Sequence, residues 1–290
     1  MTGLSYGILP AFAALALAGT PVRAASCDRA CLLRAADSFA AALPSGGPGP
    51  QAFAPGAKII ENGEAVAPGQ GLFARHVTMR SRQTFVDPAA QQIVLYGAAT
   101  SGTDYTAVFA RLKLAGGKLA EVELFTRGGE AGALSSPTAL LEPDILYEAP
   151  VPIARRSTRE AMKAVVVRYM DGLGRHDPSA VPFGSRCDRW SAGNRFTNNL
   201  KDHPIDRGGG TCAESFLRLS GEAPVNRRFG VVDPALGIAT VSFIIPHPER
   251  PSKSSTNVTE VFKIVDGKIR SIEEFSYPGR YPPHSGFDAP

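Results

Sequence analysis

Two stretches of the chain carry hydrophobic residues at the spacing of an amphipathic helix. The apolar face of the first is Leu32, Ala35, Ala36, Phe39 and Leu43, and that of the second is Met162, Val165, Val166, Tyr169 and Leu173. Steps of three and four residues place each set on one side of a helix. Ser157 and Thr158, just before the second set, are typical of a helix start. We therefore predict one helix early in each half, at positions 130 residues apart.

A strand pattern recurs later in each half. Residues 112–125 read LKLAGGKLAEVELF and residues 262–275 read FKIVDGKIRSIEEF, with matching residues 150 positions apart. In the second copy Asp266-Gly267 is a two-residue turn followed by mixed polar and apolar residues, which is typical of a β-hairpin. Upstream, FVDPA at 85–89 recurs as VVDPA at 231–235. Each helix is therefore expected to precede a meander of antiparallel strands.

These repeats predict a tandem duplication. Because the helices are 130 residues apart and the hairpins 150, the second copy holds about twenty extra residues between helix and strands. Residues 135–157, rich in proline and serine and without a hydrophobic period, are interpreted as a linker. We expect a first domain at 25–134 and a second at 158–290.

The first 24 residues have the features of a secretory signal peptide. The apolar stretch from Ile8 to Ala18 is well short of the roughly 20 residues that a membrane span needs. Val22-Arg23-Ala24 is an acceptable cleavage site. A lipoprotein, cleaved just before Cys27, is the alternative. We expect a secreted or periplasmic protein without a membrane span.

Composition and charge narrow the classes of partner. Hydrophobic residues make up 43% of the chain and charged residues 20%, which is typical of a globular protein. The net charge is +4, but the basic residues are scattered and form no stripe for nucleic acid. No nucleic-acid partner is therefore expected.

The four cysteines are expected to form disulfides in an exported chain. Three pairings are open; Cys187 and Cys212 bracket a polar loop, and Cys27 and Cys31 lie one helical turn apart. A zinc site is disfavoured because the sequence has no CxxC pair and its histidines lack metal spacing. We expect no metal and no cofactor.

Several stretches resemble a known group of proteins. They are CDRACLLRAADSFAAAL (27–43), VPFGSRCDRWSAGNRFT (181–197), VNRRFGVVD (225–233) and VFKIVDGKIRSIEEF (261–275). They resemble secreted, uncharacterised proteins of fungi and bacteria with two ketosteroid isomerase-like (nuclear transport factor 2-like, SnoaL-like) cones. The resemblance implies an α+β fold of two cones, each a helix packed on a curved antiparallel sheet, that together form a pseudo-dimer. It implies no reaction, because such cones host isomerases, dehydratases, cyclases and binding proteins.

The second copy holds most of the candidate site residues. Tyr169 stands where the first copy has Phe39. Its phenol is a candidate oxyanion donor, and the alternative is a core tyrosine bonded to a backbone carbonyl. Asp188, Arg189 and Trp190 form the most site-like cluster, with a base, a ligand clamp and a stacking surface. The alternative there is a surface ion pair on a rigid loop.

Two further residues are candidates on the strands. Arg228 is expected either to reach the same pocket or to cap a strand edge. Glu273, the counterpart of Glu123, is a candidate catalytic carboxylate. Its alternative is a cross-strand pair with Lys263, as Glu123 would form with Lys113.

Three functions remain open at this point. The first is a cofactor-independent isomerase, dehydratase or other lyase that acts on a small organic molecule by proton transfer in the second cone. The second is a non-catalytic protein that binds a small ligand. The third is an interaction module, a monomer in which the two cones face each other as a built-in dimer.

Overall fold

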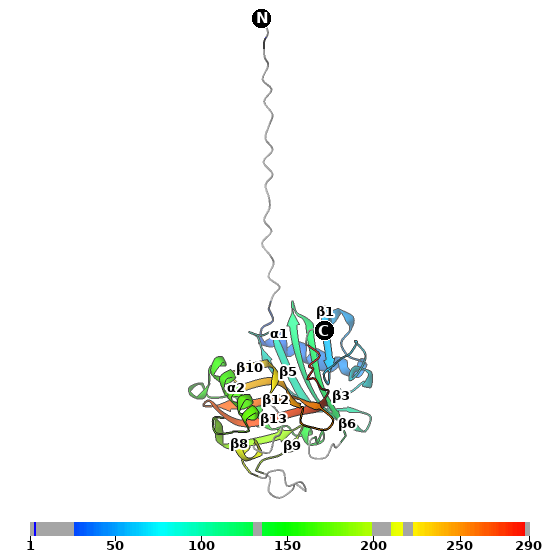
Figure 1. Ribbon diagram of the computed structural model, residues 1–290. Helices are drawn as coiled ribbons and strands as arrows, with labels where there is room; N and C mark the ends of the chain where they lie inside the picture. Colours follow the sequence, from blue (N-terminus) through cyan, green and yellow to red (C-terminus); the bar gives the residue numbers. More distant parts are fainter. Residues whose placement is uncertain (1–2, 4–25, 130–134, 199–209, 217–222, 288–290) are drawn as a thin grey trace.

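The computed structural model describes residue 3 and residues 26–129, 135–198, 210–216 and 223–287. Apart from Gly3, the predicted signal peptide lies outside these residues, as does most of the segment LKDHPIDRGGG. Each half of the chain builds one β-sheet that is preceded by a helix (Figure 1). None of the described helices is both long enough and apolar enough to cross a membrane.

The first half starts with α1 (Arg29–Ala42), whose first turn is capped by the Asp28 side chain at the Cys31 amide. The strands that follow are β1 (Phe53–Glu61), β2 (Glu64–Ala65), β3 (Thr78–Met79), β4 (Gln83–Asp87), β5 (Gln92–Ser101), β6 (Asp104–Ala115) and β7 (Lys118–Gly128). They form a sheet of order β2-β1-β7-β6-β5-β3, with β4 also paired to β5. Short 3₁₀ turns lie at Leu43–Ser45, Pro50–Ala52 and Phe73–Arg75.

The second half repeats this order. Thr158 caps α2 (Arg159–Arg175) by accepting a hydrogen bond from the Ala161 amide. The remaining elements are β8 (Phe183–Ser191), β9 (Asn194–Arg195), α3 (Cys212–Phe216), β10 (Val225–Asp233), β11 (Ile238–His247), β12 (Ser254–Val265) and β13 (Lys268–Gly279). The sheet order is β10-β11-β12-β13-β8-β9. The described residues between the halves form the 3₁₀ turns η5 (Ala139–Leu141), η6 (Ile145–Tyr147) and η7 (Ile153–Arg155).

Apart from β3, which has no counterpart in the second half, the two sheets have the same topology, which confirms the predicted fold of two cones. The turns at Gly116-Gly117 and Asp266-Gly267 both have positive φ at each residue, as a two-residue hairpin turn requires. One detail differs from the expected antiparallel sheets. In each half the strand after the helix pairs in parallel with the last strand, β1 with β7 and β8 with β13. Each sheet is therefore mixed, because these two strands are joined through the other strands of the sheet and not by a hairpin.

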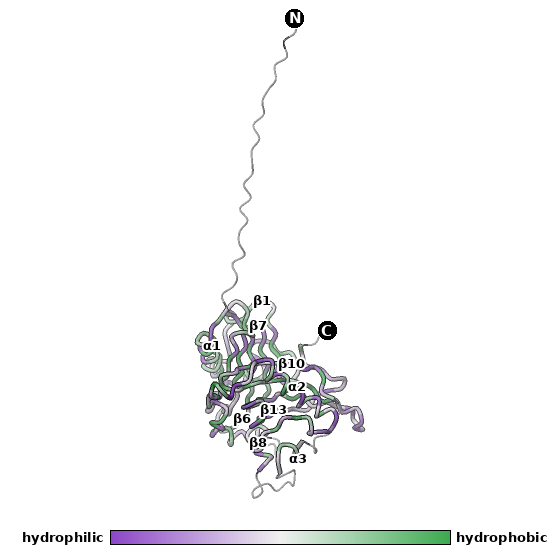
Figure 2. The backbone as a smooth tube through the Cα atoms, turned by 90° about the vertical axis from the view of Figure 1, so that its left-hand side faces the viewer, coloured by the Kyte–Doolittle hydropathy of each residue, from purple (hydrophilic) through white to green (hydrophobic). Residues whose placement is uncertain are grey.

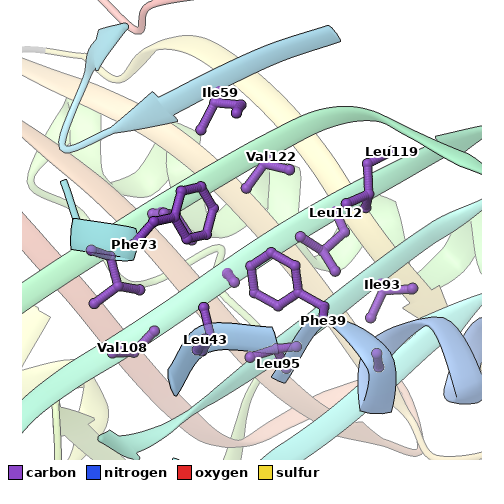
Figure 3. Close-up of a cluster of buried hydrophobic side chains, with 14 of the residues drawn as sticks. Phe39, Leu43, Ile59, Phe73, Ile93, Leu95, Val108, Leu112, Leu119 and Val122 are labelled. Carbon is purple, nitrogen blue, oxygen red and sulfur yellow. The ribbon is translucent and has the colours of Figure 1, made fainter. Parts of the chain in front are cut away.

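Each helix covers one face of its own sheet. In the first half this contact is apolar: Figure 3 shows Phe39 of α1 beside Leu43, Leu95 and Leu112, with Ile59 and Val122 further along the sheet. In the second half, residues such as Val165, Phe262 and Ile272 take the same role. Figure 2 shows hydrophobic stretches within the strands of the molecule. Central strands such as β5 and β11 are buried on both faces along most of their length.

The other faces of the two sheets pack against each other. A third core joins both halves, and its ring pairs cross the interface: Phe275 lies 5.3 Å from Tyr96 and 5.6 Å from Phe109, between ring centroids. The predicted linker contributes Leu140 and Tyr147 to this core. The molecule is therefore a pseudo-dimer within one chain.

A reciprocal pair of ion pairs marks the same symmetry. Arg29, the first residue of α1, binds Asp233 at the end of β10. Arg159, the first residue of α2, binds Asp87 at the end of β4. Each helix thus holds the opposite half of the molecule through the matching contact, as the two subunits of a symmetric dimer do.

Candidate functional site

The helix-facing side of the second sheet carries a buried polar cluster that the first sheet lacks. It consists of Tyr169 on α2, Arg189 on β8, Glu260 on β12 and Glu274 on β13, and we call these residues the quartet. By strand register and repeat spacing, their counterparts are Phe39, Ile59, Ala110 and Leu124. All four counterparts belong to the apolar core under α1. The second half has therefore exchanged four core positions for groups that can hold or move protons.

The quartet contains two direct contacts. The Tyr169 hydroxyl donates a hydrogen bond to Oε1 of Glu260, with 2.8 Å between the oxygens. The Arg189 guanidinium forms an ion pair with Glu274. Glu260 and Glu274 are cross-strand neighbours, so the two pairs adjoin. Tyr169 thus bonds to a carboxyl group, which differs from the alternative expectation of a backbone carbonyl.

The burial of these groups alters their acid–base properties. Burial, with a further contribution from Glu274, raises the pKa of Glu260 to about 8, although Arg189 opposes the shift. Burial also raises the pKa of Tyr169, so its hydroxyl keeps its proton. For Arg189, burial lowers the pKa, but the charge of Glu274 outweighs this effect and the net shift is upward. Glu260 is therefore the group in the quartet that can exchange a proton near neutral pH.

Two buried atoms of the quartet have no hydrogen-bond partner among the described residues. They are Oε2 of Glu260 and Nε of Arg189. Unsatisfied buried polar atoms are costly, and in native proteins they commonly mark a functional group or the place of a bound molecule. The quartet is thus incomplete as a purely structural network.

A hollow lies at the start of β8, and Phe183 in its lining contacts the quartet residue Tyr169. Its volume is about 560 Å³, and it is lined by Phe183–Cys187, Arg195, Asn198 and Thr211–Ala213. The Phe183 ring packs edge-on against the Tyr169 ring, with 6.3 Å between centroids. The disulfide between Cys187 and Cys212 forms part of the wall, and a second disulfide joins Cys27 and Cys31.

The structure separates the site residues predicted from the sequence. Tyr169 and Arg189 face the helix, within the quartet. Asp188 and Trp190 pair in register with Ser271 and Glu273 and face the other half of the molecule, because neighbours on a strand point to opposite sides. Asp188, Trp190 and Glu273 line a separate cavity there.

Arg228 lies neither in the quartet nor in the lining of this cavity. Its guanidinium binds the Glu123 carboxylate of the first half, with 2.5 Å between Nη2 and Oε1. Arg111 binds the same carboxylate at 2.7 Å. The expected pair of Glu123 with Lys113 is wrong, because the strand register places Glu121 opposite Lys113 and Arg111 opposite Glu123. The expected pair of Glu273 with Lys263 is wrong too, since Lys263 donates to the carbonyls of Ala149 and Leu236.

Sequence reasoning missed Glu260 and Glu274. The signal was present in the repeat, where Leu124 is the equivalent of Glu274 in the first copy. Ala110 is the equivalent of Glu260, two residues before the aligned segment. A carboxyl group at a position that is apolar in the other copy marks a change of role, as Tyr169 did against Phe39.

Comparison with known proteins gives a fold-level result. Residues 155–276 match a domain of unknown function (DUF8021). No curated protein matches the chain. A putative polyketide cyclase from Silicibacter sp. is 11% identical, with a TM-score of 0.30, over 41% of this chain and 90% of its own. SalBIII, an epoxide hydrolase/cyclase-like enzyme in pyran ring formation in the polyether salinomycin, is 15% identical, with a TM-score of 0.29, over 42% and 97%. A phenazine biosynthesis-related protein from Pseudomonas aeruginosa is 21% identical, with a TM-score of 0.28, over 41% and 76%.

Proposed function

We propose that the second cone binds a small organic molecule at the quartet and transfers a proton to or from it. The observation that carries this proposal is the exchange of Phe39, Ile59, Ala110 and Leu124 for Tyr169, Arg189, Glu260 and Glu274. Burying an ion pair and a carboxyl group commonly costs stability relative to a well-packed apolar core. The first half shows that the fold needs no such groups between its helix and its sheet, which favours a role in chemistry.

The proposed chemistry is that of a cofactor-independent isomerase, dehydratase or other lyase. Glu260 holds a proton near neutral pH and can return it, which suits a general acid or base. Tyr169 supplies a hydroxyl that can donate to an oxygen atom as negative charge develops there. The Arg189–Glu274 pair lies beside Glu260 and would hold it in place. The hollow at Phe183 is the proposed entrance.

The direct test is to convert the second cone to the residues of the first. A variant with Tyr169→Phe, Arg189→Ile, Glu260→Ala and Glu274→Leu should remain folded, because these side chains already pack in the other half. Thermal unfolding is then measured against a panel of sterols, phenolics, sugar acids and polyketide-like aromatics. A ligand present at a hundred times its dissociation constant stabilises the native protein by about 2.7 kcal/mol. The proposal expects such a ligand for the wild type and none for the variant.

A second measurement separates catalysis from binding. A ligand found in the panel is incubated with the protein in D₂O, and exchange of its C–H protons is followed by NMR. Exchange that disappears in Glu260→Gln supports proton transfer. Binding without exchange supports the alternative, a non-catalytic binding protein. A ligand retained equally by the quadruple variant would contradict the location of the site.

We also propose that the protein is exported. The two disulfides support this, because disulfides persist in oxidising compartments. The signal peptide at 1–24 stays a prediction. Mass spectrometry of protein recovered outside the cytoplasm checks it, and a mature chain that begins at residue 25 is the expected result.

A further inference from the structure

The cavity between the two halves is distinct from the quartet. Its volume is about 470 Å³. Its lining includes Asp188 and Trp190 of β8 and Glu273 of β13, together with Leu140, Pro143 and Ile145 of the segment between the halves. Glu273 is 5% exposed to solvent, whereas Ile145 is 80% exposed. An apolar rim above a buried carboxyl group is the outline of a ligand site.

The first half shows how this fold satisfies a carboxylate at the matching position. Glu123, the counterpart of Glu273, binds the guanidinium groups of Arg111 and Arg228. The ring of Phe287 lies against both guanidinium groups. Its centroid is 5.1 Å from Cζ of Arg111 and 4.7 Å from Cζ of Arg228. A buried carboxylate, planar cations and an aromatic ring therefore form one complete unit there.

The second half has the carboxyl group without the cations. Val261 lies opposite Glu273, where Arg111 lies opposite Glu123. Gln83, which pairs with Tyr96 as Arg228 pairs with Ser242, is the counterpart of Arg228 by strand register; it is uncharged, and its amide donates to the Asp144 carbonyl. Among the described residues, none forms an ion pair with Glu273, whose Oε1 accepts a hydrogen bond from the Gly193 amide at 3.1 Å. The indole Nε1 of Trp190 is also buried without a partner in the described chain.

We propose that this cavity binds a small organic cation whose guanidinium, amidinium or amine group pairs with Glu273. The ligand takes the place that Arg111 and Arg228 hold at Glu123. Its apolar body lies between Trp190 and the side chains of Pro143 and Ile145. Tyr96 supplies aromatic surface of the kind that Phe287 supplies in the first half, whereas the Trp190 ring already faces the Arg195 guanidinium, with 5.4 Å between Cζ and the ring centroid.

The other charges at the cavity agree with a cationic ligand. Glu142, Asp144 and Asp188 are the further carboxylates in its lining. Of the two lining arginines, Arg195 binds Asp188 at 2.6 Å, and the side chain of Arg186 is 71% exposed to solvent. Arg195 is therefore already paired and Arg186 faces solvent, so neither is placed to bind an anion in the cavity. Glu273, by contrast, forms no ion pair with a described residue.

The acid–base state of the two glutamates points the same way. Burial raises the pKa of Glu123, but Arg111 and Arg228 outweigh this effect and the net shift is downward. For Glu273, burial without a cation raises the pKa to about 8, with Glu274 and Asp144 adding to the shift. Besides the carboxylates and arginines of the lining, Tyr96 and Tyr147 lie near Glu273, and both keep their protons because burial raises their pKa. A bound cation would displace the proton of Glu273, so binding should strengthen as the pH rises toward 8.

The test compares three probes of one shape on the full mature chain. Benzamidine is a cation, benzamide is neutral and benzoate is an anion. Calorimetry or ligand-detected NMR should show benzamidine binding at least tenfold more tightly than benzamide at pH 8, with the difference shrinking at pH 6. Glu273→Gln should bring benzamidine to the affinity of benzamide, while Glu121→Gln, a carboxylate outside the cavity, should change nothing.

A second variant imitates the first half. Val261→Arg places a guanidinium opposite Glu273, as Arg111 lies opposite Glu123, and should abolish benzamidine binding while the protein stays folded. Equal binding of benzamidine and benzamide would overturn the proposal. So would benzamidine affinity that survives Glu273→Gln, or a preference for benzoate, which would assign the cavity to Arg186 and Arg195.

Discussion

Glu260 is a carboxyl group that folding removes from water, and this makes the stability of the protein depend on pH. Its folded pKa of about 8 lies above the roughly 4.3 of an unfolded glutamate. Between these values the folded state holds a proton that the unfolded state has lost. The free energy of unfolding therefore falls as the pH rises through this window and levels off above pH 8. Glu273 contributes in the same direction.

We predict that Glu260→Gln flattens this fall between about pH 5 and pH 8. The amide is uncharged at every pH, so one of the two linked protons disappears. Urea unfolding at several pH values checks this. Glu160→Gln, at an exposed position on α2, is the matched control and should leave the slope as in the wild type. A variant with the wild-type slope would show that Glu260 ionises normally.

Glu123→Gln should be the most damaging of the single carboxylate changes. Glu123 is buried and binds Arg111 and Arg228 from opposite halves, so its loss leaves two cations without their shared partner. Removing one member of a buried ion pair costs about 3–5 kcal/mol. Denaturant unfolding measures the loss. Glu121→Gln removes a more exposed partner of Arg111 and should cost less than about 1 kcal/mol; equal losses would contradict the assigned roles.

At the scale of elements, each helix is held at its first residue by the opposite half. Arg159 binds Asp87 and also donates to the Val232 carbonyl at 2.7 Å. Asp87 is almost fully buried, while the Arg159 side chain is 24% exposed. We predict that Arg159→Met lowers the free energy of unfolding by roughly 2–3 kcal/mol, below the full cost for a buried pair because of this exposure.

The control for this prediction lies on the same helix. Arg168 is exposed on α2, so Arg168→Met should change the free energy of unfolding by no more than about 0.5 kcal/mol. Arg29→Met, at the matching end of α1, should cost less than Arg159→Met, because the Arg29 side chain is 45% exposed. The reverse order would mean that the two contacts are not equivalent.

Much of the element order could be predicted from sequence, because it rests on local periods and on the repeat. The helix faces around Phe39 and Tyr169 and the turn at Asp266-Gly267 follow from residue spacing alone. The parallel pairing of β8 with β13 could not be predicted in this way, because the two strands are far apart in the chain and only the order of the whole sheet brings them side by side.

The site was only partly predictable for a related reason. A cluster of neighbours such as Asp188, Arg189 and Trp190 looks like one site in sequence, but a strand sends alternate members to opposite faces. Glu123, the partner of Arg228, lies 105 residues away in the other half, and no local sequence pattern predicts this contact. Glu260 and Glu274 were within reach only through comparison of the two copies.

At the scale of the whole molecule, neither half should be stable alone. Each sheet has an aromatic face that the opposite half covers. This face carries Phe109 and Phe125 in the first half and Phe275 and Tyr277 in the second. We predict that residues 26–134 and 135–290, produced separately, aggregate or stay unfolded, and that co-expression yields a 1:1 complex. Circular dichroism and size-exclusion chromatography check this. A monomeric, cooperatively folded single half would contradict it.

The joining of the two copies in one chain has a consequence for the buried charges. In a dimer of identical subunits, any residue is present twice, so a quartet in one cone would require a second quartet in the other. The desolvation cost would then be borne twice by the same assembly. In the fused chain, positions 110 and 260 can differ, and so can 124 and 274. One cone keeps an apolar layer between its helix and its sheet, and the other is free to carry polar groups there that no symmetric ancestor could have confined to a single cone.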